Sequence, residues 1–127
     1  MYEYQAIKVK VAGHKAIGLD EDEVWYASKL EGRTAILLIK AGIKFTPHVK
    51  FKVISPNGTW FHYTVDFLFD APQKPLGCHK WISFLEVKGV LTRHDLLRLS
   101  ALEYTMGLKG FIALPSMVDL WERDGLI

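Results

Sequence analysis

The stretch WISFLEVKG, residues 81–89, combines the residues of a buried β-strand with two charged side chains. Bulky apolar residues occupy both faces over 81–88, which predicts a strand in the centre of a covered sheet. Glu86 and Lys88 interrupt this pattern, and they point to the same face because side chains alternate along a strand. Charged groups are costly to bury without a partner, so this pair requires an explanation.

A β-hairpin is predicted before the central strand. FTPHVKFKVI (45–54) and TWFHYTVDFLF (59–69) are rich in β-branched and aromatic residues, and they flank the turn signal Pro56-Asn57-Gly58. Residues 72–78 are expected to form a turn-rich loop between the hairpin and the central strand.

A helix is predicted over residues 21–41, ahead of the hairpin. Asp20 and Glu23 have the spacing of a capping box, and Gly42 is a suitable stop. The apolar face of this helix is expected to consist of Val24, Ala27, Ala35 and Leu38. Its opposite, basic face is expected to consist of Lys29, Arg33 and Lys40.

A second helix and a last strand are predicted after the central strand. Thr92 and Asp95 form another capping box, which begins a helix over residues 92–106. GFIALP, which begins at Gly110, reads as a short strand, and residues 115–127 as a C-terminal tail with room for one more helix turn.

These elements follow the order helix, three strands, helix, strand. The fold class is therefore α/β, with an αβββαβ core in which helices flank a mixed central sheet. We expect a single domain over residues 1–127, divided into an N-terminal extension (1–19), a core (20–114) and the tail (115–127). Within the extension, residues 4–11 alternate as in a strand.

The composition is that of a globular protein and excludes several classes of function. Half of the residues are hydrophobic and 24% are charged, with a formal net charge of +2. The chain has no apolar run of membrane-spanning length, no signal-peptide core, no zinc-ligand spacing and no glycine-rich phosphate loop. A single cysteine, Cys78, excludes an internal disulfide and is typical of a reducing cytoplasm.

Two further acidic residues occupy unexpected positions. Asp66 shares a strand face with His62 and Thr64, although aspartate is disfavoured in the middle of a strand. At about 100° per residue, Glu31 falls within the apolar stripe of its helix. If the strands are neighbours, Asp66 and Glu86 lie side by side, and Glu31 reaches toward the same patch. We therefore expect three carboxylates and the Lys88 ammonium to converge.

Such a cluster suits a hard divalent cation. Magnesium takes one or two carboxylates, keeps several waters and completes its shell with substrate phosphate. Its bound water becomes a stronger nucleophile, while Lys88 would hold that water and add positive charge beside the transition state. The sequence therefore predicts hydrolysis of phosphodiester bonds.

Each of these residues also has a structural interpretation. Glu-x-Lys is a common tripeptide, and most examples are solvated ion pairs on an edge strand. A lone aspartate often lies at a strand end or bulge, and Glu31 at the margin of its stripe could extend into solvent. The joint occurrence of these residues, in the right elements and order, favours the catalytic interpretation.

Together these residues resemble the PD-(D/E)XK nucleases. Glu31 on the first helix, Val65-Asp66 on the second core strand and Glu86-Val87-Lys88 on the third match the family motif, except that Val65 stands where the motif has proline. Small phage enzymes of this type, which include Holliday-junction resolvases, are similar over residues 26–31, 41–43, 63–67 and 86–89. The resemblance covers roughly residues 22–114.

The resemblance implies a restriction-endonuclease-like core and a metal-dependent DNA endonuclease. The catalytic set would be Glu31, Asp66, Glu86 and Lys88, with the three carboxylates as ligands of Mg²⁺, for which Mn²⁺ can substitute. It further implies branched DNA as the partner, a homodimer, and the cytoplasm of a host cell as the location.

Four basic residues are candidates for contact with nucleic acid. Arg93, His94 and Arg98 begin the second helix, which in similar nucleases borders the site. Lys50 belongs to an alternating basic row on the first hairpin strand, where it could contact a phosphate backbone. A solvated helix face and a strand edge protected by lysines explain these residues equally well.

Three functions compete at this point. The first is a symmetric dimer that cuts branched DNA, for which the leucine-rich second helix offers apolar surface. The second is a restriction-, repair- or transposase-type nuclease of the same fold. The third is a DNA-binding module without catalysis, against which the intact set of acids and lysine argues.

Overall fold

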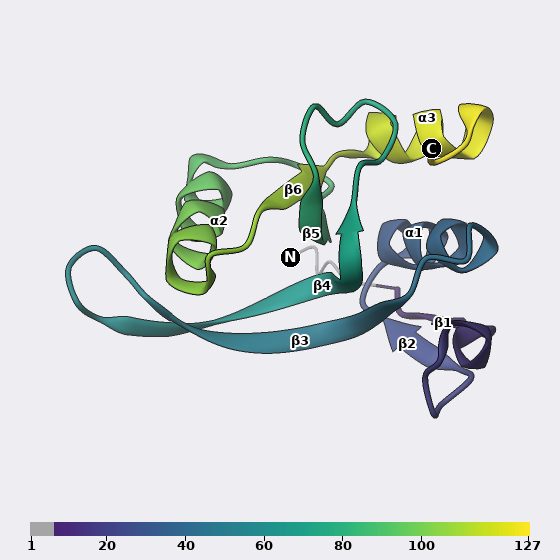
Figure 1. The fold of residues 1–127 in the computed structure, drawn as a ribbon, viewed down its shortest axis with the longest axis horizontal. Helices are drawn as coiled ribbons and strands as arrows, with labels where there is room; N and C mark the ends of the chain where they lie inside the picture. Colours follow the sequence, from purple (N-terminus) through teal and green to yellow (C-terminus); the bar gives the residue numbers. More distant parts are fainter. Residues whose placement is uncertain (1–6) are drawn as a thin grey trace, which may run out of the picture.

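The computed structural model describes residues 7–127, which form a mixed α/β fold (Figure 1). Their helices and strands, with η1 a 3₁₀ helix, are β1 (Val9–Val11), η1 (His14–Ile17), β2 (Val24–Tyr26), α1 (Lys29–Lys40), β3 (Phe45–Ile54), β4 (Trp60–Gln73), β5 (Ile82–Val87), α2 (Arg93–Met106), β6 (Gly110–Ala113) and α3 (Pro115–Asp124). From α1 to β6 the order is the predicted one of helix, three strands, helix, strand. Of the strand predicted over 4–11, residues 4–6 lie outside the described part.

The main sheet is mixed and has the strand order β3-β4-β5-β6. The pairs β3–β4 and β4–β5 are antiparallel, whereas β5–β6 is parallel. The prediction that WISFLEVK is central is confirmed, since β5 lies between β4 and β6. Side chains from its two faces enter different apolar clusters, Leu85 with α1 and α3 residues and Phe84 with α2 residues.

The β3–β4 hairpin is confirmed, but β4 is longer than predicted. The backbone N–H groups of Ser55 and Gly58 donate to the carbonyl oxygens of Thr59 and Ser55 across the turn. The strand continues to Gln73 because, beyond an irregularity after Leu68, its end pairs with the start of β5. In Figure 1 the outer part of this long hairpin extends past α2.

The helix predicted over 21–41 is wrong at its start. Residues 24–26 form β2, because they pair antiparallel with β1, and Val24, Trp25 and Tyr26 are residue types that suit a strand. The helix begins at Lys29 with Ser28 as its N-cap. Asp20 and Glu23 therefore do not cap a helix, and Glu23 instead pairs with Lys10 at 2.7 Å.

The face assignments for α1 are correct only within the true helix. Ala35 and Leu38 are fully buried, whereas Val24 belongs to β2 and Ala27 precedes the helix. On the opposite side, Arg33 pairs with Asp119 and Glu122 of α3. Gly42, with φ +70°, follows the C-cap Ala41, so the predicted stop is confirmed.

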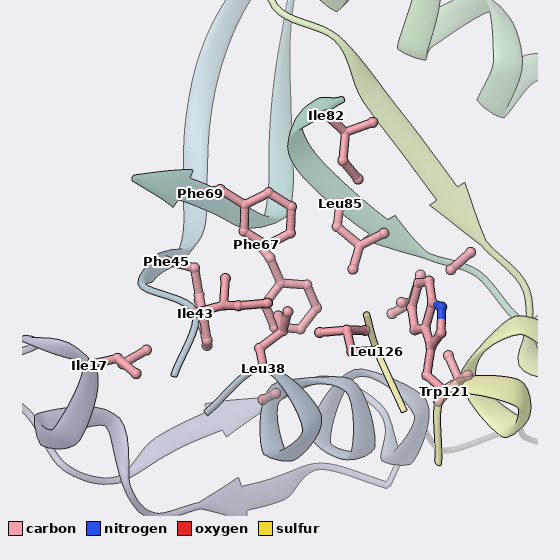
Figure 2. Packing of buried hydrophobic residues seen from close by; sticks show 14 of the residues in the cluster. Ile17, Leu38, Ile43, Phe45, Phe67, Phe69, Ile82, Leu85, Trp121 and Leu126 are labelled. Carbon is pink, nitrogen blue, oxygen red and sulfur yellow. The ribbon is translucent and has the colours of Figure 1, made fainter. Parts of the chain in front are cut away.

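The C-terminal tail is a complete helix rather than a single turn. Pro115 stands at the first turn of α3, where its fixed φ suits a helix start. Val118 and Trp121 are buried, and the Trp121 indole N–H donates to the carbonyl of Leu76 at 2.7 Å. Figure 2 shows Trp121 and Leu126 packed in the cluster that also contains Leu38 and Leu85. The tail is thus part of the core.

The second helix is confirmed in its bounds and its capping box. Thr92 and Asp95 exchange the predicted hydrogen bonds, and Gly107 ends the helix with φ +66°. Leu99 and Leu102 are buried against β3, β4 and β5, whereas Leu96 and Leu97 are exposed. Within residues 7–127, no helix is long and apolar enough to span a lipid bilayer.

Candidate functional site

Asp66 and Glu86 face each other across β4 and β5. Phe67 pairs with Leu85, which places Asp66 opposite Glu86 at the next position. The Asp66 backbone N–H donates to Glu86 Oε1 at 2.8 Å, and the Val87 N–H donates to Asp66 Oδ2 at 2.9 Å. Each carboxylate therefore accepts a backbone donor from the neighbouring strand.

These two hydrogen bonds explain why charged residues are tolerated here. The regular pairing of β4 with β5 does not continue past Phe67 and Leu85, so the next N–H groups need other acceptors. Carboxyl oxygens of Glu86 and Asp66 supply them, so neither N–H group is left without an acceptor. Each acid keeps a second oxygen, Asp66 Oδ1 and Glu86 Oε2, for another partner.

The first turn of α1 brings Glu31 to the same place. Ser28 Oγ accepts the Glu31 backbone N–H at 3.1 Å and donates to Glu31 Oε2 at 3.2 Å, which fixes both the helix start and the side chain. Glu31 is only 8% exposed, as expected from its place in the apolar stripe. Its charge also acts on the Asp66 carboxyl, whose pKa is raised by burial and by this charge.

The surroundings of Asp66 and Glu86 disfavour the ionised forms of both acids. Burial raises the pKa of Asp66 to about 9, and the charges of Glu86 and Glu31 contribute to the shift. Burial also raises the pKa of Glu86 to about 7, although the Asp66 backbone N–H and Lys88 oppose it. A cation beside these groups would remove this penalty.

Lys88 and Glu86 line one small polar cavity. Its volume is about 60 Å³, and the other lining residues are Tyr63, Thr64, Asp95 and Arg98. Lys88 Nζ lies 3.9 Å from Asp95 Oδ1 at the start of α2. The sequence prediction that Glu86 and Lys88 share a face is thus confirmed, while Asp66 and Glu31 lie beside this cavity without lining it.

The donor set fits a hard cation, although no ready-made cage is present. Asp66 Oδ1 and Glu86 Oε2, on adjacent strands, are not used by the two backbone hydrogen bonds, and oxygen is the ligand that Mg²⁺ and Mn²⁺ prefer. In residues 7–127, no three acidic, histidine or cysteine side chains already surround a single metal position. Mg²⁺ commonly uses only one or two carboxylates and fills its shell with water and phosphate, so two ligands are sufficient.

The four basic candidates are placed differently. Arg98 lines the polar cavity, and its guanidinium lies over the rings of Phe61 and Tyr63 at 5.3 and 5.2 Å. His94, one turn earlier, lies outside this cavity, and so does the exposed Arg93. Lys50 is exposed on β3 opposite Thr64, which lines the cavity.

Sequence reasoning missed three residues of the cavity as parts of a site. Thr64 shares its strand face with Asp66, a pattern that is readable in the sequence. Asp95 was recognised only as a capping residue, yet it also faces Lys88. The sequence does not mark Tyr63 as a site residue, because Tyr63 belongs to the apolar face of β4 and reaches the cavity only in the folded chain.

Another polar pair beside the acids also escaped sequence reasoning. Tyr26 is buried, and its hydroxyl lies 2.7 Å from His14 Nε2, while His14 Nδ1 is 3.0 Å from the Asp22 carbonyl oxygen. Burial and the charges of Glu31 and Asp66 raise the pKa of the Tyr26 hydroxyl above its usual range. Because the Asp22 carbonyl oxygen can only accept, His14 Nδ1 donates to it.

Protein-family models, curated proteins and solved structures were all compared with the chain, and none of them matches it.

Proposed function

We propose that this protein is a metal-dependent endonuclease that hydrolyses phosphodiester bonds in DNA, with a PD-(D/E)XK-type site. One observation carries the proposal: Asp66 and Glu86 lie side by side on adjacent strands, held by two backbone hydrogen bonds, and both have raised pKa values. Besides burial, the charge of Glu31 raises the pKa of Asp66, and Lys88 and Glu86 line the same cavity. Buried acids with strongly shifted pKa values are typical of functional sites.

The roles follow from the position of each group. Asp66 Oδ1 and Glu86 Oε2 would hold Mg²⁺, and the ion would supply an acidified water together with positive charge at the phosphate. Glu31 would orient water, because Ser28 Oγ holds its carboxyl in place. Lys88 would hold the attacking water and stabilise the charge that develops on the phosphate oxygens.

Branched DNA is the proposed substrate. Basic residues near the cavity, such as Arg98 and Lys50, suit contacts with phosphates, and such contacts carry no sequence information. A restriction-, repair- or transposase-type nuclease of the same fold would use the same four residues. Cleavage of different DNA structures distinguishes these substrates.

The test is cleavage of labelled four-way junction, flap and linear DNA of shared sequence. We expect cleavage in Mg²⁺ or Mn²⁺, binding without cleavage in Ca²⁺, and none in EDTA, since catalysis needs magnesium-like charge density. Asp66→Asn and Glu86→Gln should abolish cleavage while DNA binding persists, because the amides can still accept the backbone N–H donors. Asp70→Asn, an exposed position on the same strand, is the matched control.

Glu31→Gln should reduce cleavage less than these two variants, since Glu31 acts through water. Full activity in excess EDTA would disprove the metal role. DNA binding with no cleavage of any substrate in Mg²⁺ would instead identify a binding module.

A further inference from the structure

A groove separates the turn of the β3–β4 hairpin from α2, and we call it the hairpin groove. Its volume is about 530 Å³, within the range of roughly 300–1,000 Å³ that is usual for small-molecule pockets. The turn closes one end with Ser55 and Pro56. Apolar side chains form part of its wall, namely Phe61 of β4 and Leu97 and Ala101 of α2.

The rest of the lining is polar and basic. It consists of His62, His94 and Arg98, and the eight lining residues include no aspartate or glutamate. An apolar wall beside hydrogen-bond donors fits a flat aromatic ring, with apolar faces and polar edges, that is attached to an anion. A nucleotide has this composition, whereas an aliphatic chain would leave the donors unused.

Arg98 connects the hairpin groove to the proposed catalytic cavity, because it lines both. Its guanidinium lies over the rings of Phe61 and Tyr63, and one terminal nitrogen donates to the His62 carbonyl at 3.2 Å. Its Nε is buried and finds no hydrogen-bond partner within residues 7–127. Arg98 therefore lies between a group bound in the groove and the cavity that Glu86 and Lys88 line.

We infer that the hairpin groove holds an unpaired nucleobase of the DNA, with the attached phosphate directed along Arg98 toward Glu86 and Lys88. This inference rests on the proposed function and specifies its substrate. Unpaired bases commonly stack on aromatic rings and arginine planes, whereas a base within a duplex is already stacked and cannot enter. The groove thus favours DNA whose bases are unpaired, or open at a branch point, over continuous duplex.

The test measures binding without cleavage. A short fluorescent oligothymidylate and an abasic oligonucleotide of the same length are titrated with the full chain in EDTA, and anisotropy gives both affinities. We expect the oligothymidylate to bind roughly tenfold more tightly, because the two ligands share their phosphates and differ only in the stacked bases. Equal affinities for the wild-type protein would overturn the inference.

A matched pair of variants assigns the difference to the groove. Leu97→Glu places a negative charge on an exposed position of the lining, and Ser100→Glu places the same charge on exposed surface of α2 outside the lining. The preference for bases should disappear in Leu97→Glu and persist in Ser100→Glu, with thermal unfolding used to verify that both variants are folded. Retention of the preference in folded Leu97→Glu would overturn the assignment.

The outcomes separate this inference from the proposed function. If the protein prefers the oligothymidylate but cleaves no DNA in Mg²⁺, the inference that the hairpin groove binds a base stands and the proposal of nuclease activity is rejected. If the protein cleaves DNA but shows no preference for the oligothymidylate, the proposal of nuclease activity stands and the inference about the hairpin groove is rejected. If base preference is absent and Leu97→Glu converts a dimer into a monomer in sedimentation, a second copy of the chain covers the groove, which also rejects the inference.

Discussion

Asp66 is the residue at which stability and proposed activity oppose each other. Its carboxylate completes the pairing of β4 with β5, but burial beside Glu86 and Glu31 raises its pKa. In the folded protein the group keeps its proton to a higher pH than in the unfolded chain. Without a cation, the Asp66 carboxyl therefore takes up a proton when the chain folds. The folded protein is most stable when Asp66 is protonated, which is the form that cannot bind a metal.

The first prediction is a pH dependence of stability in EDTA. The stabilisation due to the Asp66 proton is complete below the ordinary aspartate pKa of 3.8 and is lost as the pH rises toward about 9. The melting temperature should therefore fall across this window, and Mg²⁺ should restore it at the upper end. Asp66→Asn should flatten the slope, whereas Asp70→Asn, an exposed position on β4, should not. Equal slopes for the wild-type protein and Asp66→Asn would contradict the raised pKa.

The second prediction concerns Lys88. Its side chain is 39% exposed and has one weak ion pair, so Lys88→Ala should change the free energy of unfolding by no more than about 0.5 kcal/mol. Cleavage should nevertheless fall by roughly 100-fold or more if the ammonium stabilises the transition state. Lys80→Ala, which removes a comparable exposed pair with Glu103, should leave cleavage unchanged. Loss of folding in Lys88→Ala would make the lysine structural.

At the scale of elements, the start of α1 connects fold to site. The N-cap Ser28 fixes the first turn, and the third helical residue of that turn is Glu31. The Ser28-x-x-Glu31 spacing is itself a capping signature, so the sequence contains a signal for the observed start of α1 as well as the misleading signal at Asp20. The strand residues 24–26 settle the choice, since they pair with β1.

The third prediction follows from this cap. Ser28→Ala should lower the free energy of unfolding by about 1 kcal/mol, because the Glu31 N–H loses its acceptor. Cleavage should also fall, since the Glu31 carboxyl loses its contact with Ser28 Oγ. Urea unfolding provides the measurement. Asp20→Ala should be neutral in both assays, and an equal loss there would place the helix start at residue 20.

At the scale of the whole molecule, apolar surface remains uncovered around α2. Leu96 and Tyr104 on the helix are 47% and 91% exposed, and Val90 and Leu91 before it are 75% and 38% exposed. None of these four lines the hairpin groove. We propose that a second copy of the chain covers them, since a twofold dimer would present two sites to the two halves of a DNA junction.

The fourth prediction is therefore the oligomeric state. Sedimentation should give twice the chain mass of 14.5 kDa, and Leu96→Glu should shift the protein toward the monomer. Leu97→Glu should remain dimeric, because that leucine lines the groove instead. Four-way junctions should be cut in preference to linear duplex of the same sequence. A monomeric wild-type protein would remove the basis for paired cleavage and leave the nuclease proposal standing.

The sequence by itself determined the elements whose signals are local. The hairpin turn at Pro56-Asn57-Gly58, the Thr92 capping box and the central position of WISFLEVK all depend on residues close together in the chain, and all three are confirmed. It also determined that Glu86 and Lys88 share a face, because strand alternation fixes this without any knowledge of neighbouring elements.

Only the tertiary structure decided what depends on contacts between distant segments. Residues 24–26 form a strand because they pair with β1. The tail forms a helix because Val118 and Trp121 pack into the apolar cluster that also contains residues of α1 and β5. The same holds for the pKa of Asp66, which comes from burial among carboxyls on α1 and β5, and for Tyr63 and Asp95 at the cavity of Lys88. Periodicity reports which face a residue occupies, whereas its neighbours across that face are fixed only when the chain packs.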